Sequence, residues 1–147
     1  MHYEGTVNIA AEREKVWAFL TDADFVSQCA PGIKAMEIVV PNEKYLAVAS
    51  IGFGSVVVEF KAHVEFLELK EPAFAKVTAH GDASDSAVDV TSEMHLSKGL
   101  NGSTDLAWSA DIVVLGKIAS VAARMMGSVT KKLTNQFFEC VKDQIEA

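Results

Sequence analysis

The sequence has 147 residues, among which cysteine and proline are scarce, with two cysteines and three prolines. Cys29 and Cys140 cannot form the disulfide framework of a small secreted domain, and they lack the CxxC spacing of a metal or redox motif. We therefore expect a reducing, intracellular setting. No apolar run approaches the length of a transmembrane helix, and no basic segment followed by an apolar run indicates a secretory signal.

Basic residues are also few, since 13 Lys and Arg stand against 20 Asp and Glu, giving a net charge of −7. This balance argues against general nucleic-acid binding, which needs a basic surface to displace counterions. Half of the residues are hydrophobic and 22% are charged, which is typical of a globular protein rather than a disordered one. The length predicts a single domain over residues 1–147.

Polar and apolar residues alternate along five segments, which predicts antiparallel strands with one solvated face. These segments are Ala47–Phe53, Phe60–Phe66, Lys76–His80, Val88–Leu96 and Leu106–Val114. Residues 2–10 carry β-branched side chains and predict a first strand. We expect about seven strands in all.

Helical patterns flank this strand-rich region. Glu12–Leu20 predicts one helix, and Asp22 is placed to cap a second, short helix that ends at Pro31-Gly32. From Lys117 onward a long helix is expected, with its apolar residues on one stripe: Ile118, Ala122, Met125, Val129, Leu133, Phe137 and Cys140. The predicted fold is α+β, with a strongly curved antiparallel sheet wrapped around this C-terminal helix.

The inward faces of these elements predict a ligand cavity. Small inward residues opposite a long helix favour empty volume, although a solid core without a ligand remains an alternative. Among the inward residues only Cys140 is titratable, so the sequence indicates no catalytic residue, no metal and no cofactor. The expected cavity residues are Ile51, Phe53, Phe60, Val64, Phe66, Val90, Ser92, Met94, Trp108, Ala110, Ile118, Ala122, Met125 and Val129.

Three other features of the sequence could each be a functional site, but each also has a simpler structural interpretation. His63, His80 and His95 could bind zinc, but they lie on the solvated face of their strands, and we expect surface residues. Gly52-Phe53-Gly54 lacks the following Lys-Ser/Thr of a phosphate loop and predicts a strand turn. Cys29 could be a reactive thiol, but a small apolar residue closing the second helix is the favoured interpretation.

A basic stripe lies on the C-terminal helix, opposite its apolar face. It consists of Lys117, Arg124, Lys131 and Lys142, and Phe138 is expected to point onto the same face. Five basic and three acidic residues follow position 116, a net +2, which leaves −9 for the first 116 residues. The stripe is either a solvated face or a patch for an anionic membrane or an acidic partner.

The order of elements, β-α-α-β6-α, resembles the helix-grip fold of the START-like (SRPBCC) superfamily. Local motifs, in order, are similar to the carbon monoxide dehydrogenase G-subunit family within it. They are Tyr3–Ala10 with Val16-Trp17, Cys29-Ala30-Pro31-Gly32, Ile51-Gly52-Phe53-Gly54 with Phe60-Lys61, Gly116–Ala119, Arg124-Met125, Lys131–Leu133 and Gln136–Phe138.

The resemblance implies a non-catalytic accessory protein of a molybdenum hydroxylase such as aerobic carbon monoxide dehydrogenase. It also implies an apolar ligand, a respiratory quinone or a lipid, and peripheral contact with the cytoplasmic face of the membrane. Many members continue into an apolar anchor, whereas this chain ends at Ala147, so we expect the C-terminal helix to make that contact. Two alternatives remain: an enzyme of the polyketide cyclase or hydrolase type, and an interaction protein with a filled core.

Overall fold

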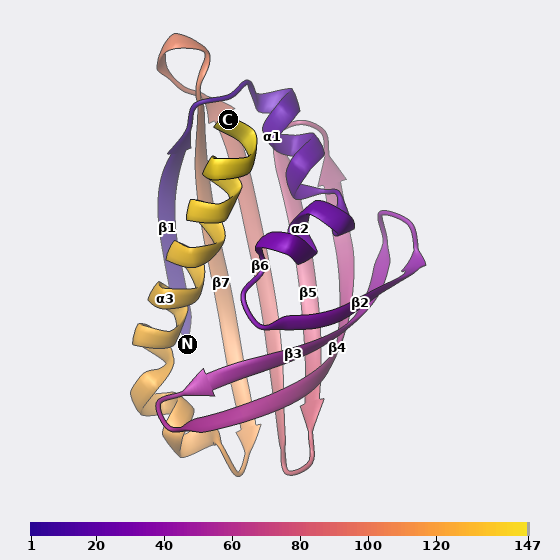
Figure 1. The fold of residues 1–147 in the computed structure, drawn as a ribbon, viewed down its shortest axis with the longest axis vertical. Coiled ribbons are helices and arrows are strands. Elements are labelled where there is room, and N and C mark those ends of the chain that lie inside the picture. The colour runs from indigo at the N-terminus through magenta and orange to yellow at the C-terminus, as the bar shows by residue number, and fades with distance from the viewer. Residues whose placement is uncertain (147) are drawn as a thin grey trace.

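Seven antiparallel strands form one strongly curved sheet (Figure 1). The structure is a computed structural model and describes residues 1–146. The strands follow the order β1-β7-β6-β5-β4-β3-β2 across the sheet. Their bounds are β1 (His2–Ile9), β2 (Ile33–Val40), β3 (Lys44–Phe53), β4 (Val56–Lys70), β5 (Phe74–Ala83), β6 (Ser86–Lys98) and β7 (Thr104–Gly116).

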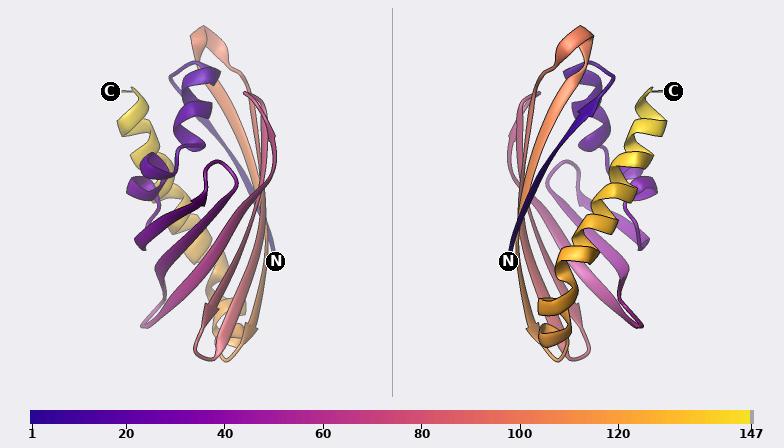
Figure 2. Two further views of the ribbon diagram at one scale, coloured as in Figure 1. Left: turned by 90° about the vertical axis from the view of Figure 1, so that its right-hand side faces the viewer. Right: turned by 90° about the vertical axis from the view of Figure 1, so that its left-hand side faces the viewer.

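Three α-helices lie on the concave side of this sheet, as the two side views in Figure 2 show. They are α1 (Arg13–Leu20), α2 (Ala23–Cys29) and the long α3 (Ala119–Glu146), and a single 3-10 turn, η1 (Leu100–Gly102), joins β6 to β7. The prediction of a curved antiparallel sheet around one long helix is therefore confirmed. The Asp22 cap is confirmed as well, because its carboxylate accepts hydrogen bonds from the N–H groups of Asp24 and Phe25.

All five alternating segments lie within strands β3 to β7, and residues 2–9 form β1. The remaining strand, β2, is an element to which the sequence pattern assigned no residues. Its pairing with β3 shifts register twice, and its apolar residues Ile38 and Val39 are both exposed. Because bulges break the two-residue period, alternation could not locate this edge strand.

The start of α3 is fixed by contacts with the β5–β6 turn. Gly116 ends β7 with a φ of +91°, which favours glycine. The N–H of Lys117 then donates to the carbonyl of Asp85 over 2.8 Å, and the N–H of Ile118 donates to Ser86 Oγ over 3.2 Å. These bonds direct the helix back across the concave face of the sheet.

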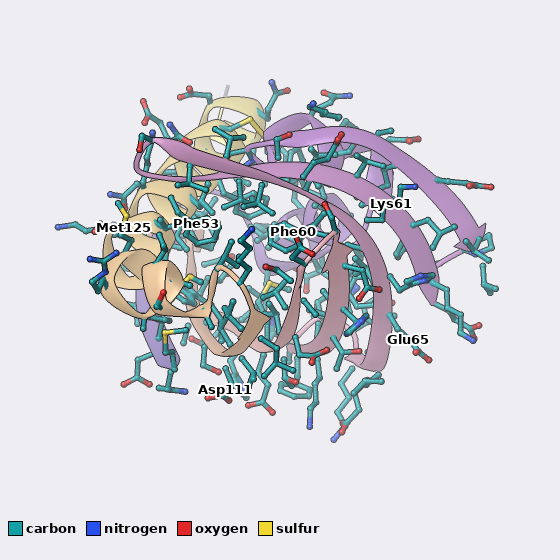
Figure 3. The ribbon with its side chains drawn as sticks, turned by 90° about the horizontal axis from the view of Figure 1, so that it is seen from below. Phe53, Phe60, Lys61, Glu65, Asp111 and Met125 are labelled. Atoms are coloured by element: carbon teal, nitrogen blue, oxygen red, sulfur yellow. A yellow bond between two sulfur atoms is a disulfide. The ribbon has the colours of Figure 1, made fainter. Side chains whose placement is uncertain are left out.

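The buried residues form two clusters along α3. The first surrounds α1, α2 and the C-terminal half of α3, and its fully buried members include Val16, Leu106 and Val141. The second surrounds the N-terminal half of α3 and consists of Phe53, Phe60, Ile112, Ala122, Met126 and Val129. Figure 3 shows Phe53 and Phe60 inside the curve of the sheet, with Glu65 and Asp111 on its outer side.

A disulfide joins Cys29, at the end of α2, to Cys140 on α3. The sequence predicts Cys29 at the end of the second helix, which is correct. It does not predict the bond between the two cysteines, and a disulfide differs from the reducing setting expected from the cysteine count. They are 111 positions apart in the sequence, yet their Cα atoms are 5.4 Å apart because α2 packs against α3. The bond fixes α2 to the long helix.

We expect this disulfide to stabilise the fold, because it closes a loop of more than a hundred residues in the unfolded chain. Replacing both cysteines, as Cys29→Ala and Cys140→Ala, should lower the free energy of unfolding by about 2–4 kcal/mol in chemical denaturation. Dithiothreitol should destabilise the wild type and leave the double variant unchanged. An equal response of both proteins to the reductant would contradict this assignment.

Candidate functional site

An apolar cavity of about 440 Å³ lies between the concave face of the sheet, α2 and the C-terminal half of α3. Its volume lies in the usual range of small-molecule sites. It borders both core clusters. The lining residues are Leu20, Thr21, Ala23, Val26, Pro31, Met36, Tyr45, Val64, Phe66, Ala75, Val77, Ser92, Glu93, Met94, Leu106, Trp108, Ala110, Thr130, Leu133, Thr134, Phe137 and Phe138.

Six of the fourteen residues predicted for the cavity lie on its wall. They come from three strands in the middle and on one side of the sheet, β4, β6 and β7. Their inward direction follows from the two-residue period on which the prediction was based. The six are Val64, Phe66, Ser92, Met94, Trp108 and Ala110.

The other eight predicted residues do not line this cavity but pack in the second core cluster or against it. Phe53, Phe60, Ala122 and Val129 are buried there, and Ile51, Val90, Ile118 and Met125 pack against them. They face inward as expected. The large side chains at this end of the molecule fill the space under the helix, so the cavity occupies only the other half.

Half of the wall residues outside the predicted set lie on the helices. Val26 on α2 and Leu133 and Phe137 on α3 reach the cavity because of how these helices are placed over the sheet. Tyr45 on β3 is different, because it continues the inward alternation of Ala47 and Ala49 by one more step. Extending that pattern toward the start of the strand would have found it.

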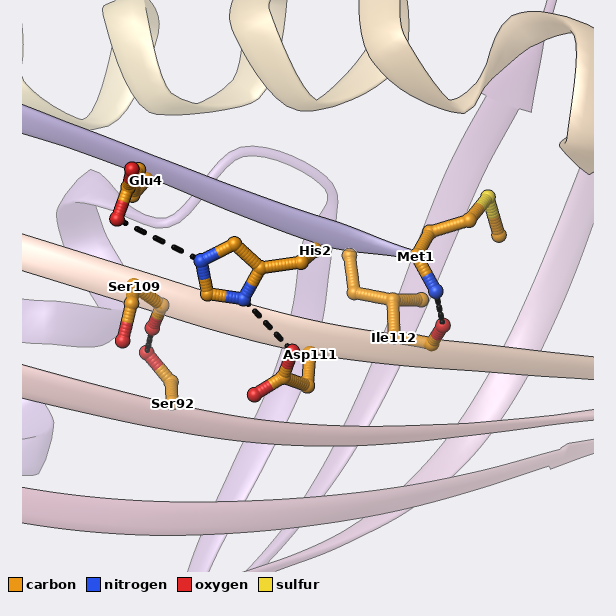
Figure 4. Close-up of polar contacts among 7 residues, drawn as sticks. All are labelled: Met1, His2, Glu4, Ser92, Ser109, Asp111 and Ile112. Atoms are coloured by element: carbon orange, nitrogen blue, oxygen red, sulfur yellow. Dashed lines mark hydrogen bonds and ion pairs between the residues drawn. The ribbon is translucent and has the colours of Figure 1, made fainter.

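Three hydroxyl groups on the cavity wall, those of Thr21, Ser92 and Thr134, donate to backbone carbonyls. Ser92 donates from its hydroxyl to the carbonyl oxygen of Ser109 over 2.8 Å (Figure 4). Thr134 donates to the carbonyl oxygen of Thr130 over 2.9 Å within α3. Since these protons are already used, the groups contribute little polarity to the cavity. The alternation along β6 directs the side chain of Glu93 to the outer face of the sheet.

Tyr45 brings a titratable group to the cavity wall. Cys140, which was expected to be the one titratable inward residue, is instead bonded to Cys29. The ring is buried and makes an edge-to-face contact with Phe66, with centroids 5.9 Å apart. Its hydroxyl oxygen accepts a hydrogen bond from the N–H of Asn42 over 3.1 Å. Burial raises the pKa of this phenol above its ordinary value of 10.0.

The histidines lie on the outer face of the sheet, as predicted. His80 contacts the carboxylates of Asp89 and Asp82, and hydrogen bonds to these two groups raise its pKa above 6.5. His63 is opposite His80 in the register, and His95 lies elsewhere, opposite Phe74. Within residues 1–146 no group of three or more His, Cys, Asp or Glu side chains is placed to hold a metal ion.

His2 makes a similar outer-face contact near the N-terminus (Figure 4). Its Nδ1 is 2.7 Å from a carboxylate oxygen of Asp111, and its Nε2 is 3.5 Å from that of Glu4. These hydrogen bonds raise the pKa of His2 above 6.5. The terminal amine of Met1 donates to the carbonyl of Ile112, which anchors the beginning of β1 on β7.

The basic stripe is exposed at Lys117, Arg124 and Lys131, and half-buried at Lys142. None of these four side chains has an ion-pair partner in the described part of the chain. Phe138 differs from the expectation that it points outward onto this face. It is half-buried, packs against the first core cluster and lines the cavity, because α3 turns this side toward Trp108 and β1.

A membrane-crossing helix would have to be both long and apolar, and no helix in residues 1–146 meets both conditions.

Comparison with protein families gives a match to the G subunit of carbon monoxide dehydrogenase (CoxG), over residues 5–146. None of the curated proteins compared matches the chain. Among solved structures, a conserved protein from Geobacillus kaustophilus is 27% identical, with a TM-score of 0.91, covering 99% of this chain and 95% of that one.

Two further structures share the fold at lower identity. The Zhui aromatase/cyclase from Streptomyces sp. R1128 is 16% identical with a TM-score of 0.76, covering 99% of this chain and 93% of its own. A START superfamily protein from Mycobacterium smegmatis is 14% identical with a TM-score of 0.74, covering 99% and 97%. The predicted helix-grip, START-like fold is confirmed.

The raised pKa of Tyr45 can be measured directly, because the protein has only two tyrosines. In a Tyr3→Phe variant the remaining phenol is Tyr45, and its ultraviolet absorbance should titrate with a midpoint above 10. Denaturant should return the midpoint to about 10. A midpoint at or below that of free tyrosine in the folded variant would show that the ring is not buried.

Proposed function

The chain belongs to the carbon monoxide dehydrogenase G-subunit (CoxG) family, and we propose that it is a non-catalytic accessory protein that carries an apolar molecule. The observation that supports this most is the apolar cavity of about 440 Å³. Apolar walls with a few polar groups are the usual form of a small-molecule site. The carrier acts as one ligand-binding domain over residues 1–147.

The ligand is a respiratory quinone or a lipid, and the partner is a molybdenum hydroxylase such as aerobic carbon monoxide dehydrogenase. In this role the protein recruits the hydroxylase to the membrane or delivers an electron acceptor to it. The family membership supports the partner, and the apolar wall supports the ligand class. General acid–base catalysis requires a positioned group with a pKa near the working pH. Tyr45 is not such a group, because burial raises its pKa above 10.0, farther from the working pH.

A binding test follows from the two faces of β7. Ala110 lines the cavity, whereas Ala107 is exposed on the outer face of the same strand. A quinone or long-chain lipid at a hundred times its dissociation constant should raise the melting temperature of the wild type by about 5–10 °C. Ala110→Phe places a ring in the cavity and should abolish this shift, while the matched Ala107→Phe should retain it.

Native extraction followed by mass spectrometry identifies the molecule that the protein carries from its host. An apolar compound recovered from the wild type and from Ala107→Phe, but not from Ala110→Phe, is expected. If no quinone or lipid shifts the melting temperature and none is extracted, the carrier proposal is wrong. The alternative of an interaction protein that binds no small molecule then replaces it.

We also propose that the basic stripe, formed by Lys117 just before α3 and by Arg124, Lys131 and Lys142 on α3, makes the transient contact with the inner face of the cell membrane, with Phe138 nearby. Each exposed Lys or Arg near an anionic surface contributes about 1 kcal/mol, and salt weakens this attraction. Because the protein as a whole carries −7, the contact is weak and reversible. Such binding suits a protein that visits the membrane and leaves it.

Co-sedimentation with anionic vesicles tests this contact. Wild-type binding should fall at high salt and be lost when Lys117, Arg124 and Lys131 are all replaced by Glu. The same charge change at exposed positions outside α3, in Lys44→Glu, Lys61→Glu and Lys98→Glu, should cause a smaller loss. Equal binding by both triple variants would mean that the stripe is only a solvated face.

A further inference from the structure

A second hollow, of about 660 Å³, lies between β1 and α3, and we call it the β1–α3 groove. One side is an edge of the sheet, because within residues 1–146 β1 pairs with β7 alone. The other side is the polar face of α3. Unlike the cavity, the groove is lined by many polar side chains, among them Tyr3, Glu4, Thr6, Lys131, Asn135, Glu139 and Lys142.

The groove adjoins the cavity. Four residues belong to both walls: Trp108, Thr130, Thr134 and Phe138. Trp108 stands at this boundary with its indole against Gly5, where a Cβ atom would lie 2.9 Å from Nε1. Glycine at this position of β1 therefore lets the ring lie against the strand. The cavity and the groove therefore lie against each other at these four side chains.

Two lysines in the groove can contact an acidic end. Lys131 and Lys142 have no ion-pair partner within residues 1–146, whereas Glu4 is already in contact with His2. The four charged residues that line the groove, Glu4, Lys131, Glu139 and Lys142, sum to a net charge of zero. An acidic group would therefore be held by direct contact with the two lysines rather than by a net positive charge of the groove.

The cavity also adjoins a hollow on the opposite side, between the α1–α2 junction and the β2–β3 turn. Thr21, Ala23 and Tyr45 line both spaces. This side carries Asp22 and Asp24 and no basic residue. An acidic group placed here would be repelled, so the two sides of the cavity differ in the ligand end that they accept.

We propose that the carried molecule is a single-chain lipid acid, whose chain occupies the cavity and whose acidic oxygens lie in the β1–α3 groove beside Lys131 and Lys142. This proposal rests on the proposed carrier function and specifies its ligand. A fatty-acid carboxylate and a lysolipid phosphate share the required chemistry. The lipid enters through the groove, and Trp108 contacts the carbons next to its head.

Calorimetric titration with palmitate, a palmitoyl lysophosphatidic acid and the uncharged hexadecanol tests the role of the lysines. Lys131→Gln with Lys142→Gln should weaken palmitate binding about three- to tenfold and leave hexadecanol binding unchanged. The matched pair Lys98→Gln and Lys132→Gln removes the same charge at exposed positions outside the groove, and should change neither. Of palmitate and the lysophosphatidic acid, the one whose binding is weakened more by the Lys131→Gln and Lys142→Gln substitutions carries the acidic group that the groove prefers.

The orientation of the lipid can be measured by fluorescence, because the protein has two tryptophans and Trp17→Phe leaves Trp108 alone. Bromine quenches a nearby indole, so 2-bromohexadecanoate should quench Trp108 more strongly than 16-bromohexadecanoate. Stronger quenching by the 16-bromo acid would place the head on the Asp22 side and overturn the proposal.

The outcomes separate this proposal from the carrier function. If hexadecanol and palmitate bind equally, respond to Ala110→Phe and ignore the lysine variants, the lipid-acid proposal is wrong and the carrier function stands. If neither probe binds and no member of the quinone and lipid panel shifts the melting temperature, both fail.

Discussion

The structure depends on one geometric constraint: a single long helix must cover the concave face of a seven-stranded sheet. Neighbouring strands are about 4.8 Å apart, so seven strands span about 29 Å, whereas a helix with its side chains is about 10–12 Å wide. Accordingly α3 packs mainly against β1, β3 and β7. The strands between them, β4 to β6, face a space that the helix does not reach, and their inward side chains decide whether it is filled.

The two ends of that space differ. Near the N-terminal half of α3, large side chains such as Phe53, Phe60 and Met126 meet and close it. Near the C-terminal half the inward residues include Ala75 and Ala110, and α1 and α2 cover the opening from the side. The disulfide between Cys29 and Cys140 holds α2 against α3 at this end. A cavity persists there because the helices span the gap without filling it.

Polarity is distributed around the cavity rather than within it. The hydroxyls of Ser92 and Thr134 are bonded to backbone carbonyls, so the wall stays apolar although it contains polar residues. Charged groups gather at the two sides, with Lys131 and Lys142 on one and Asp22 and Asp24 on the other. An apolar interior with differently charged sides suits a molecule that has a distinct polar end, which a carrier holds in one orientation.

The sequence by itself determined the strands with a solvated face, the long helix and the inward direction of residues such as Val64, Met94 and Trp108. Each follows from a local period that a strand or helix must satisfy. It also carried the motifs of the family.

The sequence could not locate β2, whose bulges interrupt the period, nor the pairing of Cys29 with Cys140. Whether an inward residue lines a cavity or fills a core was decided only by the tertiary structure, because that depends on the distance between elements far apart in the chain. Phe60 and Phe66 show this, since both face inward from β4, yet one is buried in the second core cluster and the other lines the cavity.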